Sequence, residues 1–195
     1  MSKIIEIKKN IKALIFDCDG TLADTMPTHM KAWKKSLADC GGVFRLEFFD
    51  SLKGMDDEEI VVEYNKKFHT MLNPKQVVDR KHEYFLQDIH LIQPVKPVVD
   101  VFYRCQGKLP MAVVSGGRRA LVFRTLETIH LKKYFEVILT ADDPVRPKPA
   151  PDIFLEAARR LEVAPRLCQV FEDGDVGLKA AQTAGMVTTD VRLFL

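Results

Sequence analysis

The chain has 195 residues, which is enough for one medium-sized domain or two small ones with a buried core. Hydrophobic residues make up 47% and charged residues 29% of the sequence, a composition that is ordinary for a globular protein and excludes an intrinsically disordered chain. The formal net charge of +2 gives no general attraction to nucleic acid or to an anionic membrane, so neither is expected as a partner.

The longest apolar runs are strand-sized and too short to cross a bilayer, and the opening MSKIIEIKKN lacks the apolar core of a signal peptide. The four cysteines form no C-x-x-C pair, and they occur in predicted strands, helices or strand ends. This is typical of small buried apolar side chains rather than of a disulfide framework or a zinc site. A cytoplasmic protein in a reducing compartment is therefore expected.

The sequence predicts short buried parallel strands, recognised as β-branched or apolar runs: Ala13–Phe16, Met111–Val114, Val137–Thr140, Gln169–Phe171 and Val187–Val191. Helical patterns separate the last four of these: Arg118–Ile129, Ile153–Leu161 and the alanine-rich Val176–Ala184. Strands that alternate with helices of this size predict an α/β fold, with a parallel sheet and right-handed crossovers.

Residues 26–92, by contrast, contain no convincing strand and predict only helices. The expected helices are one capped by Thr28 and stopped by Gly41-Gly42, a short one ending near Leu52, one over Asp56–His69 and one from Asn73-Pro74 to about Asp88. Because ligands of open α/β sheets bind at the carboxyl ends of the strands, this insert is expected to act as a lid there. The predicted domains are a core, residues 1–22 and 94–195, and a helical cap, residues 23–93.

Two carboxylates one residue apart, Asp17 and Asp19, follow the first strand in the stretch FDCDGTLADT. Like charges this close repel each other, so a cation or a chemical role is expected. One carboxylate can attack phosphorus as a nucleophile while the other transfers a proton, and Mg²⁺ would offset the charge of Asp17 and of a phosphate. The alternative is that Asp17 only ends a strand and Asp19-Gly20 is a turn.

Three more predicted strands run into loops that carry polar groups. The Ser115–Arg118 loop can cradle a phosphate with its backbone N–H groups and the Ser115 hydroxyl, although it is also a common turn. In RPKPAPD, flanking prolines position Lys148 ahead of a helix from Ala150, the alternative being a solvated lysine. Glu172-Asp173 begins an acidic cluster suited to a hard cation, the alternative being that Asp175 in this cluster is the N-cap of the next helix. Four such junctions in one sheet argue against chance.

In chain order, DCDGTLADT, Ser115 after a hydrophobic strand, RPKPAPD and FEDGDVGLKAA match the four motifs of the haloacid dehalogenase-like (HAD) superfamily. The resemblance covers essentially the whole chain and implies a Rossmann-like, doubly wound parallel sheet as the core. The insert resembles the small helical cap of the subgroup that contains β-phosphoglucomutase and related sugar-phosphate phosphatases. TMPTHMKAW at the cap entrance and GLKAAQTAGM after the last motif are also similar to that subgroup.

The resemblance implies a role for each catalytic residue. Asp17 would be the nucleophile that becomes a phospho-aspartate, and Asp19 would protonate the leaving oxygen and then activate water. An aspartate at position 19 favours phosphoryl transfer over dehalogenation. Ser115 and Lys148 would hold the transferring phosphoryl group, with Lys148 also offsetting the charge on Asp17.

Mg²⁺ is the cofactor that the resemblance implies. Its ligands would be Asp17 and Asp173, with Glu172 bound directly or through water, and the backbone carbonyl of Asp19. These ligands would leave the metal able to neutralise phosphoryl oxygens during an in-line transfer.

Five further residues are candidate substrate contacts: Gly116 and Arg118 in the core, and His29, Gly54 and Lys81 in the cap. His29 would lie near the hinge and orient Asp19 or contact the substrate, and Lys81 matches a cap lysine that faces the active site. The alternatives are a surface arginine at 118, a hinge-capping histidine at 29 and a solvent-facing lysine at 81.

The cap departs from β-phosphoglucomutase after the segment Leu52-Lys53-Gly54. In that enzyme an arginine that grips the non-transferring phosphate follows the matching segment, whereas here the next residues are MDDEE. These carboxylates would repel a second phosphate, which favours a substrate with one phosphate and water as the final acceptor.

The resemblance therefore implies a Mg²⁺-dependent phosphatase that acts on a small sugar or polyol phosphate, with a fructose-1-phosphate-type phosphatase as the nearest likeness. A β-phosphoglucomutase-type phosphohexomutase is the alternative in the same class, and a non-catalytic sugar-phosphate sensor is the alternative in another. The intact motif set disfavours the sensor, which need not keep a nucleophile. The expected partner is a small-molecule phosphate ester, and the expected state is a monomer.

Overall fold

The computed structural model of the chain describes residues 4–52 and 55–195. Its main sheet has five parallel strands in the order β5-β4-β1-β6-β7. The strands are β1 (Ala13–Phe16), β4 (Met111–Val114), β5 (Val137–Leu139), β6 (Cys168–Glu172) and β7 (Val187–Asp190). The predicted α/β fold with a parallel sheet is confirmed, and each predicted strand differs from the observed one by no more than one residue at either end.

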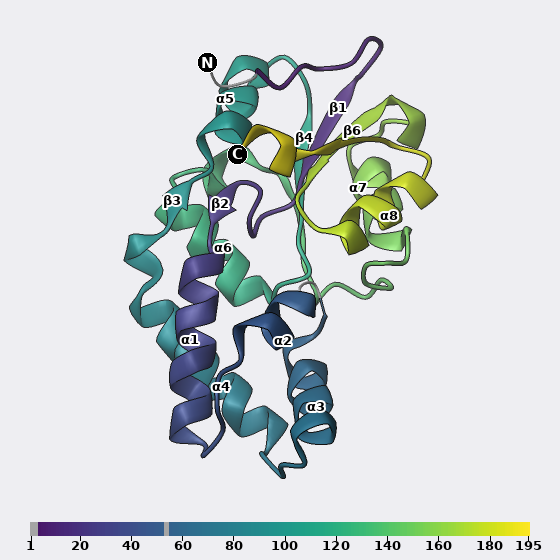
Figure 1. The fold of residues 1–195 in the computed structure, drawn as a ribbon. Helices are drawn as coiled ribbons and strands as arrows, with labels where there is room; N and C mark the ends of the chain where they lie inside the picture. The colour runs from purple at the N-terminus through teal and green to yellow at the C-terminus, as the bar shows by residue number, and fades with distance from the viewer. Residues whose placement is uncertain (1–3, 53–54) are drawn as a thin grey trace. The chain divides into compact units, whose positions relative to one another are not determined.

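Helices cover both faces of this sheet, as expected for a doubly wound fold (Figure 1). They are α5 (Lys96–Cys105), α6 (Arg119–Thr128), α7 (Asp152–Arg160) and α8 (Asp175–Thr183). Figure 1 shows α7 and α8 on one side of the sheet and α5 and α6 on the other. Because β1, β4 and β6 are buried along their whole length, the sheet forms the centre of the core.

The helix α5 is absent from the sequence prediction. Pro97 lies in the first turn of α5, where proline needs no N–H partner. The buried face of α5 includes Phe102, whose ring packs on Phe135, and Phe135 packs in turn on Phe16 of β1. This apolar contact attaches α5 to the sheet.

The remaining elements of the sheet-containing unit are short. They are β2 (Ala23–Asp24) and β3 (Gln93–Pro94), which pair antiparallel, and the 3₁₀ helices η2 (Lys132–Tyr134), η3 (Pro165–Leu167) and η4 (Val191–Phe194). In the part of the chain that the structure describes, no helix is both long and apolar enough to cross a membrane.

Residues Thr25–Ile92 form a second compact unit, which is helical. Its elements are α1 (Met26–Asp39), α2 (Leu46–Ser51), α3 (Asp57–Phe68), α4 (Pro74–Gln87) and the 3₁₀ helix η1 (Ile89–Leu91). They enclose an apolar cluster of their own, which includes Trp33, Leu37, Phe49, Val61 and Val77.

The prediction that Thr28 caps the first cap helix is wrong. Thr28 is buried inside α1, and the N-cap residue is Thr25. The helix starts earlier in the sequence than predicted because Pro27 is accommodated in its first turn. The predicted stop is observed: Gly41 has a φ of +80°, and the N–H of Gly42 donates to Leu37 O at 2.7 Å. The substrate contact predicted at Gly54 lies outside the described residues.

Candidate active site

The candidate site lies in the sheet-containing unit, at the carboxyl ends of three neighbouring strands. Strand β1 pairs in parallel with β4 on one side and β6 on the other, so that Phe16 lies opposite both Val113 and Phe171. This register brings the chain segments after β1, β4 and β6 to one edge of the sheet. These segments carry the predicted catalytic and metal-binding residues except Lys148, which lies in the loop between β5 and α7.

Lys148 forms the centre of a buried hydrogen-bond network. Its Nζ donates to Asp17 Oδ1 at 2.7 Å, to Glu172 Oε2 at 2.7 Å and to Val114 O at 3.2 Å. Burial by itself would lower the pKa of Lys148, but the Asp17 and Glu172 carboxylates raise it above its ordinary value, so the ammonium stays charged. The alternative of a solvated surface lysine is wrong, because the side chain is only 10% exposed.

The helix expected from Ala150 begins two residues later, at Asp152, with Pro151 as its N-cap residue. The N–H of Ala150 donates to Pro147 O at 2.9 Å, so this residue belongs to a turn rather than to the helix. Lys148 therefore reaches the acidic residues from a loop between two prolines, Pro147 and Pro149.

Three carboxylates meet around this ammonium. One oxygen each from Asp17, Glu172 and Asp173 lies within 4.8 Å of the others. Burial, reinforced by Glu172, raises the pKa of Asp17 well above its ordinary value, and the same two causes raise the pKa of Asp173 to about 6. Three carboxylates against one ammonium leave an excess of negative charge, and hard oxygen donors in this arrangement fit a divalent cation such as Mg²⁺.

Two further contacts connect the loops around the cluster. Ser115 is buried, its Oγ donates to Asp19 Oδ2 at 3.2 Å, and the N–H of Gly117 donates to Ser115 Oγ at 2.9 Å. Thr21, which the sequence did not single out, donates from Oγ1 to Asp173 Oδ1 at 2.9 Å. The structure thus brings Asp17 and Asp19 to one site together with Ser115, Lys148, Glu172 and Asp173.

The other predicted contacts of this unit lie beside Ser115. Gly116 is exposed, and Arg118 is partly exposed as the N-cap residue of α6. The backbone carbonyl of Asp19 stays a predicted metal ligand, as do the substrate roles of Gly116 and Arg118.

Two of the predicted cap residues, His29 and Lys81, have contacts within the helical unit. The His29 ring stacks on Phe85 with centroids 4.3 Å apart. Lys81 is 3% exposed, which excludes the solvent-facing alternative, and its Nζ donates to Asp57 Oδ2 at 2.7 Å. Burial by itself would raise the pKa of Asp57, but Lys81 and a contact with His82 outweigh this effect and lower the pKa below its ordinary value. This carboxylate is therefore ionised and paired.

A stability prediction follows from the raised pKa of Asp173. An ionised group whose folded pKa is above its unfolded one destabilises the folded state at pH values above about 6, and this penalty disappears as the pH falls below that value. We expect Asp173→Asn, measured without metal at pH 7.5, to raise the thermal unfolding midpoint by about 2–4 °C. The asparagine keeps an Oδ1 that can accept from Thr21.

Thermal melts of the two proteins from pH 5 to pH 8 check this expectation. The advantage of Asp173→Asn should shrink as the pH falls through about 6, because the wild-type carboxyl is then protonated as well. An advantage that does not change with pH would show that the cost of burying the ionised Asp173 carboxylate beside Glu172 is not its cause.

Comparison with known proteins agrees with this geometry. The family model described as haloacid dehalogenase-like hydrolase matches residues 14–191. The fructose-1-phosphate phosphatase YqaB of Escherichia coli is 39% identical over 92% of this chain and 96% of its own length. The β-phosphoglucomutase of Bacillus subtilis is 28% identical over 93% of this chain and 83% of its own length.

A solved structure of CbbY from Rhodobacter sphaeroides, in complex with phosphate, has a TM-score of 0.80 at 26% identity and covers 91% of this chain and 84% of its own. The protein belongs to the haloacid dehalogenase-like hydrolase family, and it has both phosphatase and β-phosphoglucomutase relatives. The family resemblance inferred from the four motifs is therefore confirmed.

Proposed function

We propose that this chain is a Mg²⁺-dependent phosphatase that hydrolyses a small sugar or polyol phosphate through a phospho-aspartate on Asp17. The observation that carries the proposal is the buried Asp17 carboxylate, which Lys148 holds at 2.7 Å beside the Ser115–Asp19 hydrogen bond. A structural aspartate gains nothing from burial next to two other carboxylates, whereas a nucleophile for phosphorus needs this placement.

In the first step, an oxygen of Asp17 forms a bond to phosphorus while the bond from phosphorus to the sugar oxygen breaks. Asp19 gives its proton to the departing oxygen, so the product leaves as a neutral alcohol. Ser115 and Lys148 bind the oxygens of the transferring group and keep it in line with Asp17. Because Ser115 already contacts Asp19, the hydroxyl and the acid are held next to each other before substrate binds.

In the second step, Asp19 removes a proton from a water molecule, the water oxygen bonds to phosphorus, and the bond from phosphorus to Asp17 breaks. Inorganic phosphate leaves and Asp17 is restored. When bound, Mg²⁺ would supply positive charge next to the phosphoryl oxygens, and Asp17, Glu172 and Asp173 would hold it.

The substrate class is supported by the relatives and by the acidic segment of the cap. The E. coli relative is named for hydrolysis of fructose 1-phosphate, which carries one phosphate. Here the first turn of α3 is acidic. Lys81 offsets the charge of Asp57, but Glu58 and Glu59 add negative charge that disfavours a second phosphate. We keep His29, Lys81 and Gly54 as predicted substrate contacts, and we propose a monomeric enzyme that acts in the cytoplasm.

Phosphate release from a panel of sugar and polyol phosphates tests the proposal. The panel includes fructose 1-phosphate and β-glucose 1-phosphate, each measured with and without Mg²⁺ and with and without glucose 1,6-bisphosphate. We expect Mg²⁺-dependent release of inorganic phosphate that the bisphosphate does not stimulate. Conversion of β-glucose 1-phosphate to glucose 6-phosphate with little phosphate release would identify a mutase instead, and no turnover on any ester would favour a sensor.

A further inference from the structure

Gly177, in the first turn of α8, lies against the side chain of Glu172. A Cβ placed on Gly177 would be 2.0 Å from Glu172 Oε2, 2.2 Å from Cδ and 2.8 Å from Cγ. Non-bonded carbon and oxygen atoms do not approach this closely in proteins. The carboxylate of Glu172 therefore occupies the space that any side chain at position 177 would need.

Glu172 is held on its other sides as well. Its Oε1 accepts a hydrogen bond from the N–H of Gly174 at 3.0 Å, and its Oε2 accepts one from Lys148 Nζ at 2.7 Å. The side chain is 5% exposed, so solvent offers little room for an alternative position. A Cβ at position 177 would force Glu172 to move, and the move would break one or both of these bonds.

The backbone of Gly177 gives no reason for a glycine. The residue is inside α8, where alanine is more favourable than glycine. Gly20 differs in this respect: a Cβ there would lie 2.4 Å from Asp173 Oδ2, but its φ of +86° already disfavours other residues. At position 177, therefore, the lack of space for a side chain is the reason for a glycine, and the backbone conformation is not.

We infer that Gly177 is a positioning residue, whose missing side chain lets Glu172 reach both Lys148 and the cluster formed with Asp17 and Asp173. The inference rests on the proposed function in one respect, that the cluster holds Mg²⁺. Gly177 is not one of the carboxylates or loop residues that take part in the proposed mechanism. Its effect on the reaction passes entirely through Glu172.

The test compares Gly177→Ala with the wild type by calorimetric titration of Mg²⁺ alone and by thermal melts. Because the conflict is with the end of a side chain, we expect Gly177→Ala to fold. Its unfolding midpoint should be lower than that of the wild type, because the buried Glu172 loses one or both of its hydrogen bonds. Its affinity for Mg²⁺ should fall by about 10- to 100-fold. Gln182→Ala, an exposed substitution in the same helix, is the matched control and should bind Mg²⁺ as the wild type does.

The Glu172→Ala background shows whether the effect passes through Glu172. In that background the space is empty, so adding Gly177→Ala should cause no further loss of Mg²⁺ affinity. If Gly177→Ala fails to fold, the double variant should fold as well as Glu172→Ala does. Mg²⁺ binding by Gly177→Ala that equals the wild type, or a further loss in the double variant, would overturn the inference.

Turnover measurements separate this inference from the proposed function. With a phosphate ester that the wild type hydrolyses, Gly177→Ala should need about 10- to 100-fold more Mg²⁺ for half-maximal rate. At saturating Mg²⁺ it should recover much of its kcat. If the wild type hydrolyses no ester, the proposed function fails, but the Mg²⁺ titrations still decide the role of Gly177.

Discussion

Replacement of Asp17 by asparagine is expected to lower kcat for any hydrolysed phosphate ester by about 10⁴-fold or more. The amide has no carboxylate to bond to phosphorus, so the covalent step has no nucleophile. Asparagine has nearly the same shape and keeps an Oδ1 that can accept from Lys148 Nζ, as Asp17 does at 2.7 Å. The loss should therefore be chemical rather than structural, and steady-state phosphate release measures it.

Two controls make this result specific. Asp100→Asn, the same substitution at an exposed aspartate of α5, should leave kcat unchanged. The thermal unfolding midpoint of metal-free Asp17→Asn should equal or exceed that of the wild type, because burial and Glu172 raise the pKa of Asp17 and make its charge costly. Turnover by Asp17→Asn within about tenfold of the wild type would rule out the phospho-aspartate mechanism.

Replacement of Lys148 by methionine is expected to have the largest effect on stability. The substitution removes the cation between Asp17 and Glu172 and leaves their carboxylates buried without a positive partner. Breaking a buried ion pair from one side costs about 3–5 kcal/mol in the free energy of unfolding. Turnover should also be lost, because the ammonium that would bind the phosphoryl group is gone.

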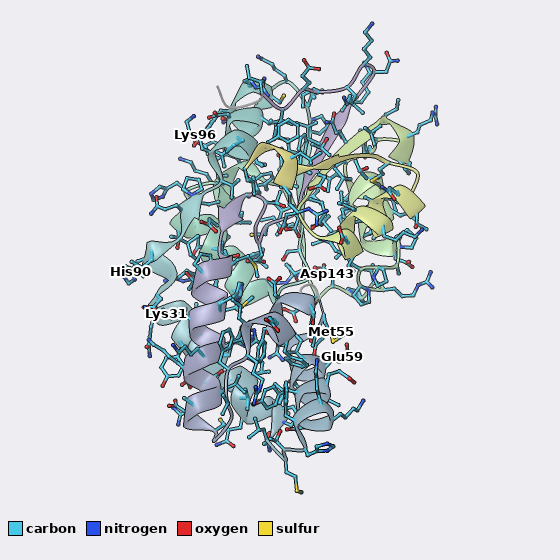
Figure 2. All side chains as sticks on the ribbon, in the orientation of Figure 1. Lys31, Met55, Glu59, His90, Lys96 and Asp143 are labelled. Carbon is cyan, nitrogen blue, oxygen red and sulfur yellow. The ribbon has the colours of Figure 1, made fainter. Side chains whose placement is uncertain are left out.

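Lys96→Met is the matched control for stability. Lys96 Nζ lies 2.7 Å from Asp100, the same distance as Lys148 Nζ from Asp17, but its side chain is 82% exposed and lies at the surface of its unit (Figure 2). Exposed pairs contribute little, so Lys96→Met should hardly change the free energy of unfolding. Urea denaturation of both variants in metal-free buffer makes the comparison. Equal losses would contradict the assigned role of the buried ammonium.

The pH dependence of the Lys148→Met effect gives a second check. Without the ammonium, a proton is the remaining means of neutralising Asp17, whose pKa burial and Glu172 already raise. The folded variant therefore binds more protons than the unfolded chain, and its stability should rise as the pH is lowered from 8 towards 5. If the free energy of unfolding of Lys148→Met stays below that of the wild type by a constant amount over this range, the cause is lost packing rather than unpaired charge.

The strands and the chemistry of the loops could be predicted because both depend on short-range features. A buried parallel strand is a continuous apolar run whatever surrounds it, so Ala13–Phe16 and Met111–Val114 were predicted with their observed bounds. The motif residues Asp17, Ser115 and Lys148 each follow a strand. Since the carboxyl ends of parallel strands share an edge, their meeting followed from the fold class.

Proline misled the prediction where its effect depends on the neighbouring backbone. Pro97 lies in the first turn of α5, Pro27 shifts the start of α1 to Met26, and Pro151 delays the start of α7 to Asp152. Proline is compatible with a first helical turn and with a loop alike. The local sequence therefore does not distinguish these two environments.

The sequence by itself determined which chemical groups this protein has and the order in which the sheet presents them. Only the tertiary structure decided which of those groups touch. Lys148 donates to Glu172 as well as to Asp17, and Lys81 pairs with Asp57 across 24 positions of sequence. Gly177 lies within a predicted helix, and only the structure shows that Glu172 occupies the place of its missing side chain. Such contacts depend on how closely helices and strands pack, and packing distances are a property of the whole core rather than of any short segment.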